Sequence, residues 1–389
     1  MNKKRIMFVF GTRPEAIKMA PVITALAKYP DILEPMIVVS GQHRQMLDQV
    51  LRIFNIHPDY DLGIMAKNQT LVDIVTKSLS GLEEIVLREK PDMLLVQGDT
   101  STTFAAGLAA YYYKIPLGHI EAGLRTFDKW RPYPEEINRK LTTSLADIHF
   151  APTETSVANL LAEKVSRNSI YLTGNTVIDA LLTTAKGKFD LKQAGINLTA
   201  GKKTVLVTTH RRENFGEPLK NICQAIARLA QEHVKTIEII MPVHKNPLVK
   251  ETVANILAEV DNVQLTDPLD YEPFVHLMKE SYLILTDSGG VQEEAPSLGK
   301  PVLVLREKTE RPEAVAFGTV KLVGSDEQLI FAEADKLLKD RAAYEKMSQA
   351  VNPYGDGQAA GRIVSALLYY FGAVDRKPEE FKVKELVRG

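Results

Sequence analysis

Charged side chains that could bind an anion or move a proton follow several short apolar segments of this sequence. They are Arg13, Lys18, Asp99, Glu121 and Glu135, and the three acids are expected in loops. Buried carboxylates near one another can have pKa values pushed apart, so that one acts as an acid and another as a base near neutral pH. Alone, each acid is typical of a structural role, and Asp99 could cap the helix that follows it. As a set, they predict an acid–base site that also holds an anion.

The segment GTRPEAIK, which begins at Gly11, has the strand–turn–helix layout of a nucleotide site. Its turn contains one glycine, whereas a dinucleotide-binding turn contains three. Pro14 suits the first helical turn, where its missing N–H is harmless. Arg13 offers a planar fork of donors to a phosphate, and Lys18 adds a point charge one turn further on. The segment predicts a pyrophosphate held by side-chain charge, the alternative being a solvated helix N-terminus.

A second phosphate site is predicted in the segment LILTDSGGVQEEAPSLG. A strand ends at Asp287, and Ser288, Gly289 and Gly290 open a helix. Exposed backbone N–H groups and the helix dipole favour an anion there, and paired glycines allow close approach. Glu294, one turn further on, could hold ribose hydroxyls. The alternative is a glycine turn followed by an acid-rich first helical turn.

Other reactive side chains narrow the chemistry. His210 follows the apolar segment TVLVTT and precedes two arginines, so it could be a general acid, a phosphate donor or a structural histidine. No two histidines have metal-ligand spacing, and we predict no catalytic metal. Nucleophilic catalysis is disfavoured because there is no G-x-S-x-G segment and Cys223 lies within a helical pattern.

Parallel sheets would bring these residues together. Apolar strand segments alternate with helical patterns along most of the chain, which indicates parallel sheets covered by helices on both faces. The helices are predicted over residues 14–29, 42–54, 70–89, 100–113, 218–232 and 290–298. In such sheets ligands bind beyond the carboxyl ends of the strands, where the charged residues lie.

The chain divides into two similar halves. At 389 residues it is too long for one ordinary core. The first sheet is expected to end near residue 172, and the polar segment 189–203 precedes a new strand at 204–209. Residues 91–123 and 281–313 share one order of features, namely strand, Asp turn, small-residue helix, X-Pro strand and acidic loop.

Composition excludes several classes of protein. The chain is 45% hydrophobic and 25% charged, as soluble globular proteins are. Its formal net charge of −1 argues against nucleic-acid and membrane partners. The single cysteine excludes a disulfide framework, and the apolar run before Gly11 is too short for a signal peptide. Because no apolar stretch approaches about 18 residues, we expect a cytoplasmic protein.

The sequence resembles the non-hydrolysing UDP-N-acetylglucosamine 2-epimerases. The resemblance rests on segments that occur in the family's order: GTRPEAIKMAPVI, GQHRQML, VQGDT, HIEAGLRT, PEEINR, TTHRREN, TDSGGVQEEAP, TERPEAV and NPYGDGQAAGRI. It implies a glycosyltransferase-B-like α/β fold, in which two Rossmann-like domains with parallel sheets face a cleft. The implied domains are residues 1–172 and 173–358, and residues 359–389 form a helix that returns to the first domain.

The resemblance also implies a reaction, the interconversion of UDP-GlcNAc and UDP-ManNAc without NAD or another cofactor. The C2 proton leaves with UDP, 2-acetamidoglucal stays bound, and UDP adds back as a proton reaches the other face. Such chemistry needs a placed base and a stabilised leaving group. The family's acid–base and supporting groups align with Asp99, Glu121, Glu135, Lys18, Arg139 and His210. Which acid serves which face stays open.

Ligand contacts follow from the same resemblance. UDP would bind Arg13, His210, Phe274, Ser288, Gly289, Gly290 and Glu294. A second UDP-GlcNAc, an allosteric activator in bacterial members, would bind Gln42, Gln45, Glu136, Arg211 and His244. Asn68 stands where many members have an arginine, which removes one expected phosphate contact. The family also implies a homodimer.

Three alternatives stay open. A hydrolysing epimerase would release free ManNAc and UDP, and its known animal examples carry a kinase domain for which this chain has no room. A glycosyltransferase of the same architecture would need an acceptor site. A non-catalytic sensor of nucleotide sugars would have no need for Lys18, Asp99, Glu121 and Glu135 together.

Overall fold

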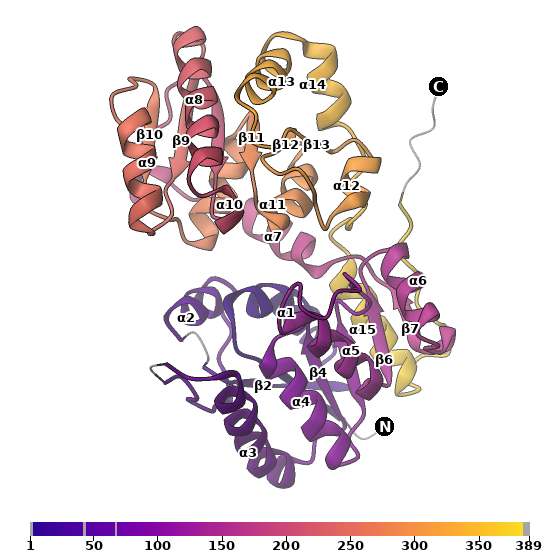
Figure 1. The fold of residues 1–389 in the computed structure, drawn as a ribbon. Coiled ribbons are helices and arrows are strands. Elements are labelled where there is room, and N and C mark those ends of the chain that lie inside the picture. Colours follow the sequence, from indigo (N-terminus) through magenta and orange to yellow (C-terminus); the bar gives the residue numbers. More distant parts are fainter. Residues whose placement is uncertain (1–2, 42–43, 67, 384–389) are drawn as a thin grey trace. The chain divides into compact units, whose positions relative to one another are not determined.

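The computed structural model describes residues 3–41, 44–66 and 68–383, without the side chains of residues 44–46. The chain forms two compact units (Figure 1). The first unit runs to Ala180 and resumes at Tyr354–Lys382, and the second is Leu181–Pro353. The sequence analysis placed the boundaries after residues 172 and 358, whereas the compact units meet after Ala180 and Pro353.

The first unit is built on a seven-stranded sheet in which neighbouring strands are parallel. Its order is β3-β2-β1-β4-β5-β6-β7. The strands are β1 Lys4–Phe10, β2 Leu33–Val39, β3 Tyr60–Asp61, β4 Met93–Gln97, β5 Leu117–Ile120, β6 Ile148–Ala151 and β7 Ile170–Leu172. The central strands are continuous apolar runs because helices cover both faces of the sheet.

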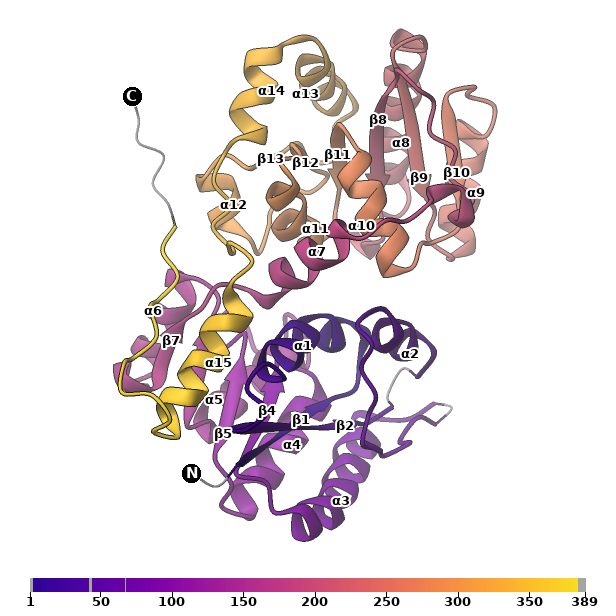
Figure 2. The same ribbon diagram turned by 180° about the vertical axis from the view of Figure 1, so that it is seen from behind.

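Helices α1 and α15 pack against each other in the first unit (Figure 2). The helices of this unit are α1 Arg13–Leu26, α2 Arg44–Ile53, α3 Leu71–Glu89, α4 Ser101–Tyr112, α5 Glu135–Leu145, α6 Glu154–Ala162, the 3₁₀ turn η1 Arg167–Ser169, α7 Thr176–Lys186 and α15 Ala359–Tyr370. The chain passes into the second unit within α7. Buried Asp179 of α7 accepts hydrogen bonds from the N–H groups of Ala359 and Ala360, and so caps α15 from outside that helix.

The second unit contains a six-stranded parallel sheet of order β10-β9-β8-β11-β12-β13. Its strands are β8 Lys203–Thr208, β9 Ile237–Pro242, β10 Val263–Thr266, β11 Leu283–Thr286, β12 Val302–Val304 and β13 Val320–Leu322. Its helices are α8 Glu217–Glu232, α9 Pro247–Leu257, α10 Tyr271–Glu280, α11 Gly289–Glu294, α12 Pro312–Ala316, α13 Glu327–Lys339 and α14 Arg341–Ser348, with 3₁₀ turns η2 Leu191–Ala194, η3 Arg212–Asn214 and η4 Ala295–Leu298.

One predicted helix is divided. Residues 290–298 form α11 and then the 3₁₀ turn η4, because Pro296 has no N–H to continue the α-helical ladder. Within α8, Cys223 is fully buried, and this burial raises its pKa to about 12, so it is packing rather than a reactive thiol.

The two sheets share one topology, which confirms the predicted α/β fold. In each, the chain starts at a central strand, moves to one edge, and returns to fill the other side. The strand order reverses between β1 and β4 in the first sheet and between β8 and β11 in the second. Open α/β sheets bind ligands beyond the carboxyl ends of the strands at such a switch point.

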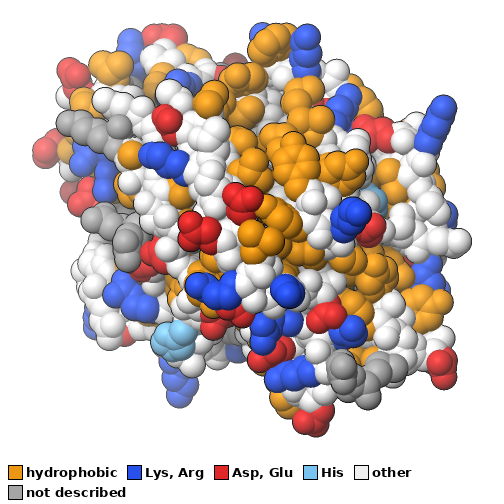
Figure 3. Space-filling view, turned by 90° about the horizontal axis from the view of Figure 1, so that it is seen from below, with side chains coloured by type: hydrophobic (Ala, Val, Ile, Leu, Met, Phe, Trp, Pro, Cys, Tyr) orange, Lys and Arg blue, Asp and Glu red, His pale blue; other side chains and the backbone are white. Residues whose placement is uncertain are grey.

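Apolar side chains gather in a band on the face of the molecule shown in Figure 3. The exposed large apolar side chains of the first unit include Leu87, Tyr111, Tyr112, Phe127, Trp130, Tyr133 and Leu141.

Among the described residues, no helix combines the length and apolar character needed to cross a bilayer.

Candidate active site

The first unit carries charged residues at its switch point. Strand β1 leads through Gly11 into α1, and a Cβ atom on Gly11 would lie 2.0 Å from the Oγ atom of Ser40. This close approach explains the single glycine of the turn. Arg13 and Lys18 follow on α1, and Asp99 follows β4.

Lys18 and Glu121 form a largely buried ion pair. The Nζ atom of Lys18 lies 2.6 Å from both carboxylate oxygens of Glu121, and the two side chains are 18% and 6% exposed. Gln97 and Asn175 also donate hydrogen bonds to this carboxylate. Three elements, α1, β4 and the segment after β7, therefore fix the position of Glu121, which follows β5.

The backbone of Glu121 is also unusual. Its φ angle is +63°, in the left-handed region that non-glycine residues rarely adopt. Strained residues of this kind cluster at functional sites, where the surrounding contacts hold them in place. Glu121 therefore combines strain, burial and a cation partner at the carboxyl end of β5.

Asp99 is held by helix α5. The guanidinium group of Arg139 contacts the Oδ2 atom of Asp99 at 2.7 and 2.8 Å, and Asn138 donates to the Asp99 carbonyl. Thr100 caps α4 by accepting the N–H of Thr103, so the alternative capping role for Asp99 is not observed. The side chain of Asp99 stays 25% exposed, as a group that meets a substrate must.

Two adjacent glutamates of α5 have different surroundings. Glu135 opens the helix instead of lying in the predicted loop, and its Oε2 atom is buried without a hydrogen-bond partner among the described residues. Glu136 is fully buried and accepts the N–H groups of Thr126 and Phe127 as well as a contact from Arg139. Glu136 thus organises the loop before α5, and the ligand contact that the resemblance implies for it stays a prediction.

In the second unit, His210 is oriented by Asp287. The Nδ1 atom of His210 lies 2.8 Å from the Oδ1 atom of Asp287, which is fully buried after β11. Asp287 also accepts the N–H groups of His210 and Arg211 and the amide of Asn214. Burial acts to raise the pKa of Asp287, but hydrogen bonds from His210 and Arg211 outweigh it and lower this pKa.

Arg211 lies beside the glycines that open α11. A Cβ atom on Gly289 would lie 3.7 Å from the Nη2 atom of Arg211, and a Cβ atom on Gly290 would lie 3.3 Å from Glu294. The glycine turn is therefore flanked by a cation and a carboxylate. This places Arg211, which was predicted as an allosteric contact, next to Ser288 and its neighbours, which were predicted to bind UDP.

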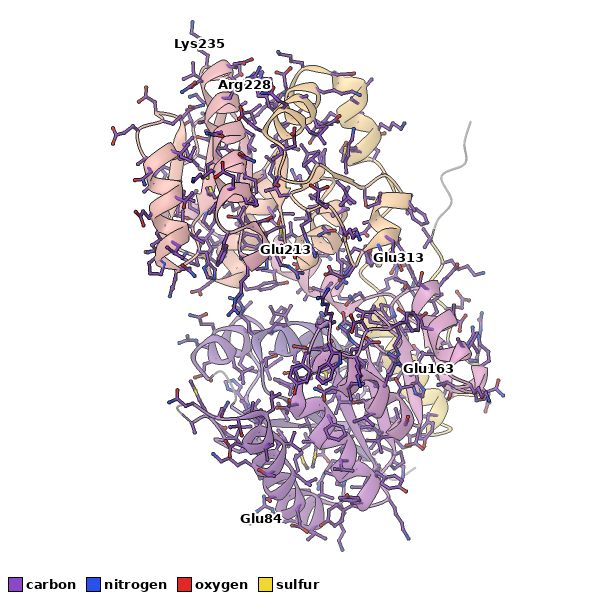
Figure 4. All side chains as sticks on the ribbon, viewed as in Figure 1. Glu84, Glu163, Glu213, Arg228, Lys235 and Glu313 are labelled. Atoms are coloured by element: carbon purple, nitrogen blue, oxygen red, sulfur yellow. The ribbon has the colours of Figure 1, made fainter. Side chains whose placement is uncertain are left out.

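A charged network supports this turn. Arg306 is 8% exposed and contacts Glu213 at 2.6 Å and Glu310 at 2.7 Å. Glu213 is labelled in Figure 4. Hydrogen bonding to Arg306 lowers the pKa of Glu310 to about 2. Glu310 also lies 3.8 Å from Arg211. The loop after β12 is thereby tied to the segment that carries His210.

The remaining predicted residues lie on other elements. Phe274 is half-buried on α10, and the Nδ1 atom of His244 accepts the N–H of Asn246 beyond β9. Asn68 is exposed with a φ angle of +58°. Gln42 lies outside the described residues, and the side chain of Gln45 is not described either. Among the described residues, no group of three His, Cys, Asp or Glu side chains could hold a metal.

Sequence analysis missed two residues that organise the site. The sequence marks Asp287 only as the end of a strand, whereas the structure makes it the partner of His210. Glu15 is buried and accepts four hydrogen bonds from the turns after β1 and β4. The available signal was the spacing of Thr12 and Glu15, which is that of a helix capping box.

The fold and the two charged switch points define a glycosyltransferase-B-like α/β protein. A glycotransferase of kitacinnamycin shares this fold at 12% identity, with a TM-score of 0.63 over 97% of this chain and 100% of that chain. The family model for UDP-N-acetylglucosamine 2-epimerase matches residues 25–368. The chain belongs to the UDP-N-acetylglucosamine 2-epimerase family.

Individual relatives support this assignment. The UDP-N-acetylglucosamine 2-epimerase of Escherichia coli K12 is 56% identical over 370 residues, which cover 93% of this chain and 98% of that protein. The Bacillus subtilis enzyme of the same name is 51% identical over 387 residues, covering 99% and 100%. A crystal structure of UDP-GlcNAc 2-epimerase from Neisseria meningitidis, bound to UDP-GlcNAc, is 50% identical, with a TM-score of 0.82 over 94% of this chain and 99% of that chain.

Proposed function

We propose that this protein is a non-hydrolysing epimerase that interconverts UDP-GlcNAc and UDP-ManNAc. The similarity to epimerases over nearly the whole chain supports the reaction and the substrate. The observation that carries the chemistry is the carboxylate set of the first unit. Lys18 holds Glu121, Arg139 holds Asp99, and Glu135 keeps a buried oxygen without a partner among the described residues.

In this proposal each unit contributes a chemical task of its own. The glycine turn of α11, with Arg211 and the His210–Asp287 pair, binds the diphosphate and stabilises UDP as it leaves. The carboxylates of the first unit remove the C2 proton and return one to the other face of bound 2-acetamidoglucal. Lys18 contacts both carboxylate oxygens of Glu121, whereas Arg139 contacts only the Oδ2 atom of Asp99 and the Oε2 atom of Glu135 has no hydrogen-bond partner among the described residues. Glu135 and Asp99 are therefore the two candidates to accept the proton, and which acid serves which face stays open. The UDP-ManNAc product would supply cell-surface polysaccharide synthesis.

The deciding experiment follows UDP-GlcNAc and the protein in D2O by proton NMR, without added metal or NAD. Conversion to UDP-ManNAc, with deuterium at C2 of both epimers, is the expected result. Free ManNAc and UDP would show the hydrolysing reaction instead. An unchanged spectrum, even with UDP-GlcNAc in large excess, would favour a transferase or a binding protein.

Two further expectations stay predictions. Activation by a second UDP-GlcNAc would make the rate of UDP-ManNAc epimerisation rise when traces of UDP-GlcNAc are added.

The position of Arg211 beside Gly289 favours a direct contact with the substrate diphosphate. Replacing Arg211 by Met should therefore raise the KM for the substrate even where activation is saturated. A homodimer would be detected as twice the chain mass by light scattering.

A further inference from the structure

Glu15, in the first turn of α1, is a buried acid to which the proposed chemistry gives no role. Its side chain connects two separate turns. The Oε2 atom accepts the N–H groups of Gly11 at 3.0 Å and Thr12 at 2.8 Å. The Oε1 atom accepts the hydroxyl groups of Thr100 at 2.7 Å and Thr103 at 3.1 Å. One carboxylate thus joins the end of β1 to the end of β4.

These two turns lie at the switch point of the first sheet. The turn after β1 leads directly to Arg13 and, one helical turn later, to Lys18. The turn after β4 contains Asp99. The next residue, Thr100, donates a hydrogen bond from its hydroxyl group to the carboxylate of Glu15. The hydroxyl of Thr103 also lies 2.8 Å from the carbonyl of Gln97.

Helix capping alone does not account for these contacts. A capping box needs only the bonds to the backbone at the start of its own helix, which Oε2 makes. Oε1 instead binds a second element more than eighty residues away in sequence. Burial raises the pKa of Glu15, and the hydrogen bonds from the two turns oppose this shift. A buried acid is costly to keep where an apolar side chain would fill the same space.

We propose that Glu15 is a positioning residue, which holds the turn that carries Arg13 and Lys18 in register with the turn that carries Asp99. Its catalytic consequence rests on the proposed epimerase function. Glu15 itself does not touch the substrate. It sets the spacing between the cations on one side and the acid on the other.

The test compares Glu15→Ala, Glu15→Gln and Thr103→Val in the full-length protein. Glu15→Ala should lower kcat on the order of 100-fold, as expected for misplaced catalytic groups, with little change in KM. Glu15→Gln should restore most of the activity, because its oxygen accepts the two N–H groups and its NH2 donates to hydroxyls that can reverse their roles. Thr103→Val keeps the cap of α1 and should lower kcat less than Glu15→Ala, which gives a test even if the alanine variant does not fold.

The matched control is Asp92→Ala. Asp92 also accepts a backbone N–H and a side-chain contact, but at the other end of β4. It should lower stability without changing kcat at temperatures below unfolding. Wild-type kcat in folded Glu15→Ala and in Thr103→Val would overturn the proposal.

Hydrogen exchange separates this inference from the proposed function. In Glu15→Ala, amides of residues 11–16 and 100–104 should exchange faster, whereas those of β2 should not change. If the wild-type protein does not epimerise UDP-GlcNAc but exchange changes in this way, the proposed function fails and the positioning role stands. Unchanged exchange in both turns would overturn the positioning role whatever the wild type catalyses.

Discussion

The imidazole of His210 is 47% exposed, yet its Nδ1 atom lies 2.8 Å from a carboxylate, that of Asp287, with no exposed surface. Asp287 in turn is fixed by two backbone N–H groups and by Asn214. A buried acid that accepts from one ring nitrogen sets the orientation of the imidazole and leaves the other nitrogen for a ligand. His210 is therefore presented to its ligand by a rigid support.

Replacing Asp287 by Asn should lower kcat about 10- to 100-fold, since an amide holds the imidazole of His210 less firmly in its orientation. Steady-state epimerisation assays measure the effect. Asp335→Asn is the matched control, because Asp335 contacts His233 at 2.7 Å in the same unit, and His233 lies before the start of β9 rather than at the carboxyl end of a strand. Equal kcat values for the two variants would contradict the role of Asp287.

Removing the cation of the Lys18–Glu121 pair should lower both the stability and the activity of the protein. Lys18→Met leaves a buried carboxylate without its charge partner, so the free energy of unfolding should fall by about 3 kcal/mol and activity should be lost. The double variant Lys18→Met, Glu121→Gln should recover much of the stability but none of the activity. Urea denaturation and NMR assays of both proteins would show this. A double variant as unstable as the single one would argue against the charge as the cause.

Glu135→Gln should lower the rate of deuterium incorporation at C2 on the order of 100- to 10,000-fold, because an amide cannot accept the proton. Stability should change little, since the buried Oε2 atom has no partner to lose among the described residues. Glu154→Gln serves as the control, because Glu154 also opens a helix of the first unit but is exposed. Isotope exchange that persists at the wild-type rate in Glu135→Gln would remove Glu135 from the mechanism.

Acid should destabilise the first unit through His119. Burial lowers the pKa of His119 from 6.5 to about 3, although its Nε2 atom donates to the carbonyl of Gly98. Between these values the unfolded chain binds a proton that the folded chain does not. The contribution of neutral His119 to the free energy of unfolding is therefore complete above pH 6.5. It is lost as the pH falls toward 3, at about 1.4 kcal/mol per pH unit.

His119→Gln keeps a donor for Gly98 and should flatten the pH dependence, measured as urea midpoints between pH 4 and 7 at intervals of about half a pH unit. His57→Gln, which changes an exposed histidine, should leave the slope as it is in the wild type. If the His119 variant keeps the full wild-type slope, another group controls acid stability.

Sequence was informative wherever one local pattern decided the structure. Continuous apolar segments located the central strands, and parallel strands bring their carboxyl ends to one edge, so Asp99, Glu121 and His210 were expected there. Strands β3 and β13 have only two and three residues, which is too short for a periodic signal. The helix predicted over residues 290–298 contains Pro296, which ends the α-helical ladder, so the structure divides it into α11 and η4.

The pairing of side chains could not be predicted from the sequence. Lys18 and Glu121 are separated by 103 residues, so their contact depends on how both elements pack on the sheet. Glu135 and Glu136 are adjacent on a helix, where neighbouring side chains point about 100° apart. Glu136 therefore faces inward and holds the loop before α5, whereas Glu135 points elsewhere. No local feature of the sequence distinguishes the two glutamates.

The connection of α7 to α15 has a consequence for synthesis on the ribosome. Helix α1, which carries Arg13 and Lys18, is covered by α15, the last helix among the described residues. At about 5 to 20 residues per second, the roughly 190 residues between Ala180 and Tyr370 take on the order of 10 to 40 s to translate. During that interval α1 has been synthesised but its apolar face is not covered by α15. Asp179 also lacks the hydrogen bonds that it later accepts from the N–H groups of Ala359 and Ala360. A nascent chain that pauses while its second unit is being synthesised would thus expose the apolar face of α1 in its first unit, and chaperones would bind there.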